Sequence, residues 1–236
     1  MAIDKEYTFG LVHGAWHGAW CWEPLQAELE NLGVSSIAMD LPIDDPAKNF
    51  NDYADVVIEH MSQEKNIVLV GHSRGGNVIP RAAKALAARK LIFLHSSFEP
   101  ATIGHPVRHE VGFMPERNNP VFQKAIIRKD HGLTIFDQRY APQLFYNDCT
   151  PGIQEWATSK LRPQRRSEDE PTLYDWPAEI QQEYIIAEDD QIINPKWSQY
   201  VAENWLTIDP VYIEGGHSSF LSRPRKLARL LIELAE

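Results

Sequence analysis

The chain has few cysteines, no long apolar run and a deficit of positive charge. Cys21 and Cys149 are the only cysteines among 236 residues, too few for the disulfide framework of a small secreted domain. No stretch of about 18 consecutive apolar residues occurs, so we expect no membrane span. The start, Met1–Glu6, lacks the basic and apolar regions of a secretory signal. We therefore expect a cytoplasmic protein.

Acidic side chains outnumber basic ones by 33 to 23, which gives a net charge of −10. A negative surface repels nucleic acid and anionic membranes, so we expect neither as a partner. The short basic segment Arg162–Arg166 is followed by the acidic Glu168–Glu170, and we expect this region to be a solvated loop. The length suits one sizeable core, in a monomer or a homodimer.

Short apolar runs alternate with segments of helical periodicity. Most of the runs are apolar on both faces, as in a parallel sheet covered by helices. We predict an α/β fold with about six mostly parallel strands. Pro80 falls inside the third predicted helix, which it should kink or locally open. The predicted strands are Thr8–Val12, Ser35–Met39, Ile67–Val70, Leu91–Leu94, Tyr184–Ala187 and Val211–Ile213. The predicted helices are Trp22–Leu32, Tyr53–Gln63, Asn77–Arg89, Pro195–Asn204 and Pro224–Glu236.

The alternation stops between Glu99 and Pro177. About 80 residues without secondary structure would be unusual inside a compact domain. We therefore predict a helical cap over residues 99–177, inserted into a core of residues 1–98 and 178–236. Its helices are expected at Pro120–Lys129, Tyr140–Asn147 and Ile153–Lys160.

A glycine-rich turn follows the third predicted strand. Its sequence, Gly71-His-Ser-Arg-Gly-Gly76, matches G-x-S-x-G between a strand and a helix. In such a turn the serine adopts a positive φ and projects its hydroxyl from the sheet, while the flanking glycines avoid collisions. The pattern predicts that Ser73 is a nucleophile.

A serine nucleophile needs a histidine base and an acid that orients it. The last two predicted strands lead into Glu188-Asp189-Asp190 and into Glu214-Gly-Gly-His217, in the chain order expected for this architecture. His217 is the predicted base. Among the three adjacent carboxylates we favour Asp190 over Asp189, with Glu188 third.

An oxyanion hole needs two backbone N–H donors. We expect one from Arg74, directly after the nucleophile, and the other from the turn after the first strand, at Ala15. Around this hole, Gly14, Trp16, Phe145 and Trp156 are predicted to contact substrate. The aromatic residues of the insertion favour an apolar pocket for a small or medium ester.

The chain resembles the α/β-hydrolase superfamily, and within it the methylesterase and hydroxynitrile-lyase group in its bacterial esterase-like branch. The resemblance is densest at Leu11–Trp22, Gly71–Gly76, Glu188–Pro195 and Gly215–Pro224. It implies an α/β-hydrolase fold, cleavage of carboxylic esters through an acyl-enzyme on Ser73, and Asp190 as the acid.

Two other functions fit the same fold. Hydroxynitrile lyases of this group carry a threonine and a lysine where this chain has Gly14 and Ser218, so the resemblance favours hydrolysis. A small-ligand receptor without turnover, or with slow turnover, is the other alternative, and an intact triad argues against it.

We expect no cofactor and no metal. The pairs His13/His17 and His105/His109 have four-residue spacing, but neither has a third ligand at a motif distance. Gly71–Gly76 lacks the lysine of a phosphate-binding loop.

Overall fold

Six parallel strands form the central sheet of the computed structural model, which describes residues 7–98, 116–166 and 170–236. The strand order is β2-β1-β3-β4-β8-β9, with parallel pairing throughout. This confirms the predicted α/β class. The strands are β1 (Thr8–Val12), β2 (Ser35–Met39), β3 (Val68–His72), β4 (Lys90–Leu94), β8 (Gln181–Ala187) and β9 (Val211–Ile213).

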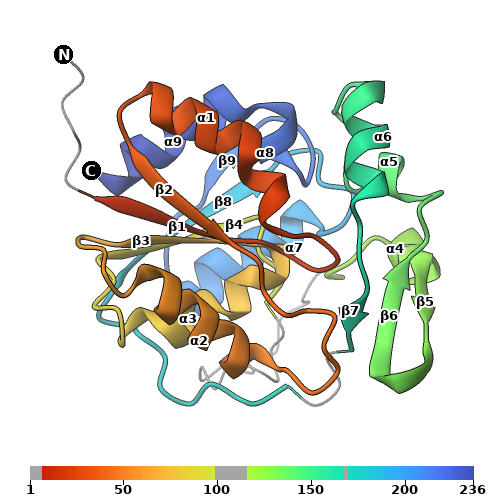
Figure 1. Cartoon of the computed structure of the whole chain (residues 1–236). Helices are drawn as coiled ribbons and strands as arrows, with labels where there is room; N and C mark the ends of the chain where they lie inside the picture. Colours follow the sequence, from red (N-terminus) through yellow and green to blue (C-terminus); the bar gives the residue numbers. More distant parts are fainter. Residues whose placement is uncertain (1–6, 99–115, 167–169) are drawn as a thin grey trace.

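Helices cover both faces of this sheet, which explains why its central strands are buried throughout. Every residue of β1, β3 and β4 is buried. Helices α1 (Glu23–Asn31) and α9 (Pro224–Ala235) lie on one face, and α2 (Phe50–Met61) and α3 (Ile79–Ala83) on the other (Figure 1). The remaining helices of the core are η1 (Ala19–Trp22), η2 (Ser73–Asn77), α7 (Pro195–Val201), η5 (Ala202–Leu206) and α8 (Ser219–Ser222).

The prediction that Pro80 lies inside a helix is wrong. The chain first forms the 3₁₀ turn η2, and α3 begins only at Ile79, so Pro80 lies in its first turn. A proline is tolerated there because the first backbone N–H groups of a helix have no intrahelical acceptor. The α-helix predicted to reach Arg89 ends at Ala83.

The segment between β4 and β8 contains a second sheet as well as helices. The helix predicted over Pro120–Lys129 ends at Ala125, and the next residues form a hairpin of β5 and β6. His131 and Gly132 have positive φ in its turn, and β7 completes an antiparallel sheet. The elements are α4 (Pro120–Ala125), β5 (Ile126–Arg128), η4 (Asp130–Gly132), β6 (Leu133–Phe136), α5 (Ala141–Leu144), α6 (Pro151–Ser159) and β7 (Gln164–Arg165).

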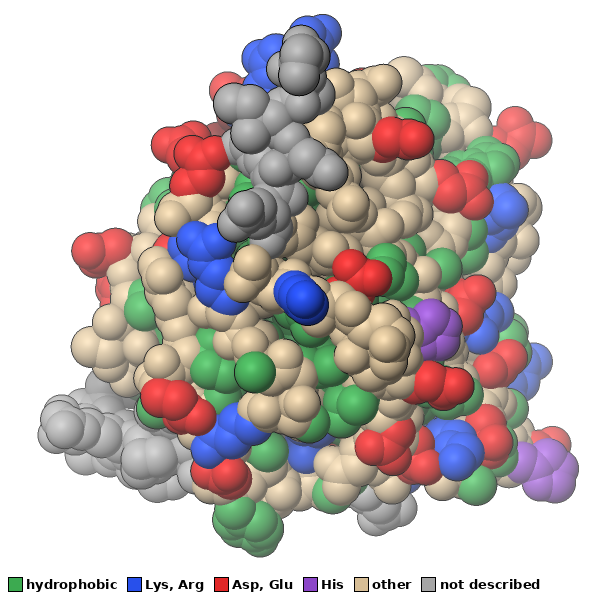
Figure 2. Space-filling view, turned by 60° about the vertical axis from the view of Figure 1, so that its left-hand side comes forward, with side chains coloured by type: hydrophobic (Ala, Val, Ile, Leu, Met, Phe, Trp, Pro, Cys, Tyr) green, Lys and Arg blue, Asp and Glu red, His purple; other side chains and the backbone are tan. Residues whose placement is uncertain are grey.

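This second sheet and its helices lie to one side of the central sheet (Figure 1). The predicted start of the cap at residue 99 lies outside the described residues, and its boundaries stay a prediction. None of the described helices is both long enough and apolar enough to cross a membrane. On the face turned forward in Figure 2, acidic and basic side chains are interspersed.

Candidate active site

Ser73 lies at the point where β3 turns into η2. It adopts the predicted positive φ, 49°, which is strained for a residue with a Cβ. A Cβ at Gly71 would lie 2.7 Å from the carbonyl oxygen of Gly75, and a Cβ at Gly75 would lie 2.5 Å from that of Val12. The two glycines therefore allow strand, turn and helix to pack closely enough to present Ser73.

His217 and Asp190 meet at the carboxyl ends of β9 and β8. The Nδ1–H of His217 donates to Oδ2 of Asp190 at 2.7 Å, and both side chains are buried. The other carboxylate oxygen, Oδ1, accepts from the backbone N–H groups of Ile192 at 2.7 Å and Ile193 at 2.9 Å. Asp190 thus fixes the ring orientation of His217 and leaves its Nε2 as the acceptor nitrogen.

The Nε2 of His217 is buried and has no hydrogen-bond partner within the described residues. Glu188 and Asp189, the other two candidates for the acid, are exposed. The structure therefore brings Asp190, and neither of its two acidic neighbours, to the His217 ring.

Three further histidines surround the His217 ring without carrying charge. His72, directly before Ser73, donates from Nε2–H to the backbone carbonyl of His217 at 3.0 Å, with ring centroids 4.6 Å apart. Burial holds the pKa of His72 well below its usual value, and it lowers the pKa of His95 to about 4 and that of His17 to about 3. These three histidines therefore add no positive charge around His217 at neutral pH.

The turn after β1 is held in a defined shape. Trp16 has a φ of 58°, and its carbonyl accepts from the backbone N–H of Arg162 at 3.0 Å. His17 Nδ1–H donates to the Ala15 carbonyl at 2.8 Å, and Arg162 Nε donates to the His17 carbonyl at 2.9 Å. The Ala15 N–H donates to no group in the described part of the chain. Arg74, the other predicted donor, is in the first turn of η2.

Gly14 packs directly behind the candidate nucleophile. A Cβ built on it would lie 2.9 Å from the Cβ of Ser73 and 3.0 Å from Nδ1 of His72. Both distances are at or below the limit for a real Cβ, so a larger residue at position 14 would displace the Ser73 turn.

A cavity of about 270 Å³ opens over Ser73. Trp16 and Phe145, two of the predicted substrate contacts, line it. Trp16 is held there by an Nε1–H bond to Thr134 Oγ1 at 3.2 Å. The structure does not bring Trp156 into this cavity: its ring packs edge-on against Trp20, with centroids 5.2 Å apart.

The prediction of a solvated loop at residues 162–166 and 168–170 is wrong for the parts that the structure describes. Arg162 supports the turn after β1, and Arg165 and Arg166 line the cavity. Glu170 has a fully buried side chain that pairs with Arg74 at 2.5 Å and with Arg165 at 2.8 Å. Arg165 and Glu170 are five positions apart, but Arg74 lies 96 positions from Glu170 and His17 lies 145 from Arg162, so local composition could not reveal these contacts.

His13 and His17, one of the two pairs considered as metal ligands, are engaged in hydrogen bonds. His13 donates to the Gly14 carbonyl and accepts from the Leu41 N–H, and His17 accepts from the Tyr146 hydroxyl at 2.9 Å. His105 and His109 lie outside the described residues. Within those residues, no three histidine, cysteine or acidic side chains come together at a spacing that suits a metal ion.

Known proteins resemble this chain over nearly its whole length. Norfluorocurarine synthase 2 from a Strychnos species is 29% identical over 260 residues, covering 98% of this chain and 96% of the relative. Methylesterase 7 from Arabidopsis thaliana is 24% identical over 275 residues, covering 100% and 99%. The crystal structure of polyneuridine aldehyde esterase has the same fold, with a TM-score of 0.77 at 19% identity over 98% of this chain and 100% of that one. The model of the "Alpha/beta hydrolase family" matches residues 11–230, and the chain belongs to this family.

Proposed function

We propose that this protein is a serine hydrolase that cleaves small or medium carboxylic esters through an acyl-enzyme on Ser73. The observation that carries the proposal is the state of the His217 ring beside the Ser73 turn. Its Nδ1–H donates to Asp190, and its Nε2 is buried and has no hydrogen-bond partner among the described residues. A histidine in this state is ready to accept a hydroxyl proton. Relatives named as esterases support ester cleavage as the reaction.

In the first step, Ser73 Oγ attacks the ester carbonyl while Nε2 of His217 accepts the hydroxyl proton. Asp190 stabilises the imidazolium that forms, because its carboxylate is already hydrogen-bonded to Nδ1–H. The backbone N–H groups of Ala15 and Arg74 donate to the developing oxyanion. His217 then returns the proton to the leaving alcohol, and a water molecule releases the acid by the same sequence.

Cyanohydrin cleavage is a weaker candidate for this site. The lyases of this group carry a threonine where this chain has Gly14, and a side chain there would press on Ser73 and His72. Ser218 follows His217 and is buried, so no positive charge stands at that position to stabilise a departing cyanide.

Hydrolysis of p-nitrophenyl butyrate tests the proposal. We expect S73A to lower kcat by at least about a thousandfold, because the acyl-enzyme cannot form. S62A, which removes an exposed hydroxyl at the end of α2, is the matched control and should keep wild-type activity. Mass spectrometry after reaction with a fluorophosphonate should find the label on Ser73.

Two results would contradict the proposal. One is an S73A enzyme that retains most of its activity. The other is a wild-type protein that binds esters without turnover, as a receptor would.

We also propose a cytoplasmic location and a monomeric or homodimeric state. The free thiols of Cys21 and Cys149 agree with a reducing compartment.

A further inference from the structure

The cavity over Ser73 is lined by positive charge although the whole chain is strongly acidic. Among the described residues that line it, five are arginines and none is acidic, whereas the protein has a net charge of −10. On the face turned forward in Figure 2, acidic and basic side chains are interspersed. The excess of arginine is therefore a local property of the cavity. The arginines are Arg74, Arg117, Arg128, Arg165 and Arg166.

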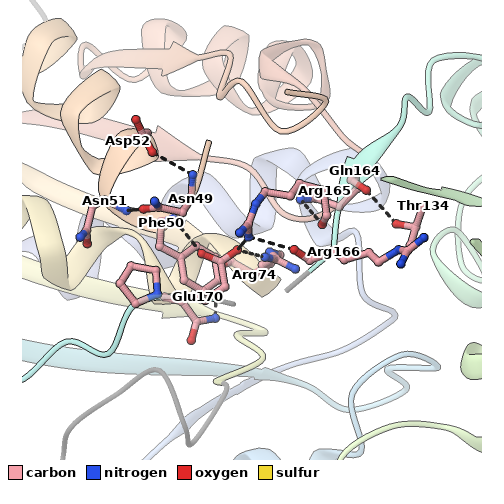
Figure 3. A network of polar contacts seen from close by, with 12 residues as sticks. Asn49, Phe50, Asn51, Asp52, Arg74, Thr134, Gln164, Arg165, Arg166 and Glu170 are labelled. Carbon is pink, nitrogen blue, oxygen red and sulfur yellow. Dashed lines mark hydrogen bonds and ion pairs between the residues drawn. The ribbon is translucent and has the colours of Figure 1, made fainter. Parts of the chain in front are cut away.

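Glu170 compensates part of this charge. Its carboxylate lies between the guanidinium groups of Arg74 and Arg165, with Oε1 at 2.5 Å and 2.8 Å from them (Figure 3). Its Oε2 accepts from the backbone N–H of Phe50 at 2.9 Å. The two guanidinium groups share this one carboxylate in a buried network.

Arg117 and Arg166 have no carboxylate partner within the described residues. Arg117 donates to the Asn118 side-chain oxygen and to the Phe98 carbonyl, each at 3.0 Å. Arg166 donates from Nη2 to the Lys129 carbonyl at 2.7 Å, while its Nε is buried without an acceptor. Both residues line the cavity, and among the described residues their guanidinium groups donate to neutral oxygens and meet no carboxylate.

The segment that carries Arg117 is tied to the loop that holds Asp190. Asn118 pairs with Ile193 in an antiparallel bridge, and the Asn119 N–H donates to the Ile192 carbonyl at 3.2 Å. The N–H groups of Ile192 and Ile193 are the donors that fix Asp190. Arg117 is thus built into the same framework as the candidate catalytic residues.

We propose that the substrate is an ester that also carries a carboxylate, held by Arg117 and Arg166 while Ser73 attacks the ester group. A guanidinium fork matches a carboxylate in shape and charge. The apolar side chains of the cavity, among them Phe122, Ile126 and Phe145, suit a short carbon chain between the two groups. The volume of about 270 Å³ limits that chain to a few carbons. This inference rests on the proposed esterase function and specifies its substrate class.

Two pairs of esters matched in size test the inference. Monomethyl glutarate is compared with methyl hexanoate, which places the carboxylate on the acyl side. Acetoxyacetate is compared with propyl acetate, which places it on the alcohol side. In at least one pair we expect kcat/KM for the charged ester to exceed that for the neutral one by about tenfold or more at low salt. High salt should reduce this preference, because it screens partly exposed charges.

Variants then assign the preference to residues. R117Q and R166Q should each lower the charged-to-neutral ratio of kcat/KM by about three- to tenfold, mainly through KM for the charged ester. R229Q removes the same charge from the exposed side of α9 and should leave the ratio unchanged.

Neutral esters that react as fast as their charged partners in both pairs would overturn the inference, and so would a ratio unaffected by both arginine variants. The comparison in the wild-type enzyme and its salt dependence need no variant to fold. Ser73-dependent hydrolysis of the neutral esters would still support the esterase function, so the two failures are distinguishable.

Discussion

The two sides of the cavity over Ser73 differ in the charge of their side chains. On the side of the central sheet, the histidines around His217 are buried and uncharged, and Asp190 is fixed by backbone N–H groups. On the side of the segment between β4 and β8, arginines line the wall, and Glu170 from this segment pairs with Arg165 and also with Arg74, which follows Ser73. The difference agrees with the two proposals made above, in which residues on the sheet side cleave the ester and residues on the other side select the substrate.

Asp190→Asn tests the sheet side and should have the largest effect. The amide cannot stabilise the imidazolium of His217 and favours the wrong tautomer, so we expect kcat to fall by about three to four orders of magnitude. The preference between charged and neutral esters should remain, because the arginines are untouched. Steady-state kinetics on the ester pairs measures both, and a lost preference would show that the two sides are not separable.

Glu170→Gln tests the side formed by the segment between β4 and β8, and it should lower the stability of the protein. The amide keeps the shape but removes the carboxylate that pairs with Arg74 and Arg165, both largely buried. We expect the free energy of unfolding in urea to fall by about 3 kcal/mol. D175N, which breaks the exposed pair with Lys84, is the control and should cost less than about 1 kcal/mol. Equal effects of the two substitutions would contradict the buried network.

The pH dependence of the free energy of unfolding gives a further test of the sheet side. Burial lowers the pKa of His13 and His95 to about 4 and that of His17 to about 3. The unfolded chain, with pKa values near 6.5, therefore binds more protons, and stability that is present above about pH 6.5 is lost as the pH falls toward 4.

Each of these histidines should contribute up to about 1.4 kcal/mol per pH unit in that window. Urea unfolding between pH 6.5 and 5 measures the slope before most carboxylates titrate. H17Q should reduce the slope, and H60Q, at an exposed position, should not. A stability independent of pH across this window would mean that the buried histidines titrate normally.

The sheet side was the more predictable from sequence. A parallel sheet brings the carboxyl ends of its strands to one edge, so the chain order of Ser73, Asp190 and His217 was enough to expect them together. The choice of Asp190 over Asp189 was a local argument about the turn. Two features could not be predicted from the sequence pattern. They are the backbone N–H groups of Ile192 and Ile193 that donate to Asp190, and the hydrogen bond from His72 to the His217 carbonyl.

The other side was much less predictable. Helical periodicity over Pro120–Lys129 overlooked the β-branched Ile126 and Ile127 and the glycine turn that follow, which form a hairpin. The pairing of Arg74 with Glu170 spans 96 positions, a separation at which composition carries no signal. Trp156 is an aromatic residue in the segment predicted to form the substrate pocket, but its ring packs against Trp20, away from the cavity.

Arg162 has a consequence for engineering this enzyme. It comes from the segment between β4 and β8, but it supports the turn after β1 through the carbonyls of Trp16 and His17 and also donates to the Leu41 carbonyl at 2.7 Å. A chimera that replaces this segment to change specificity therefore also removes the hydrogen bonds by which Arg162 supports the turn after β1. Grafts that retain an arginine in this position should keep their turnover, whereas grafts without it should lose turnover whatever pocket they bring.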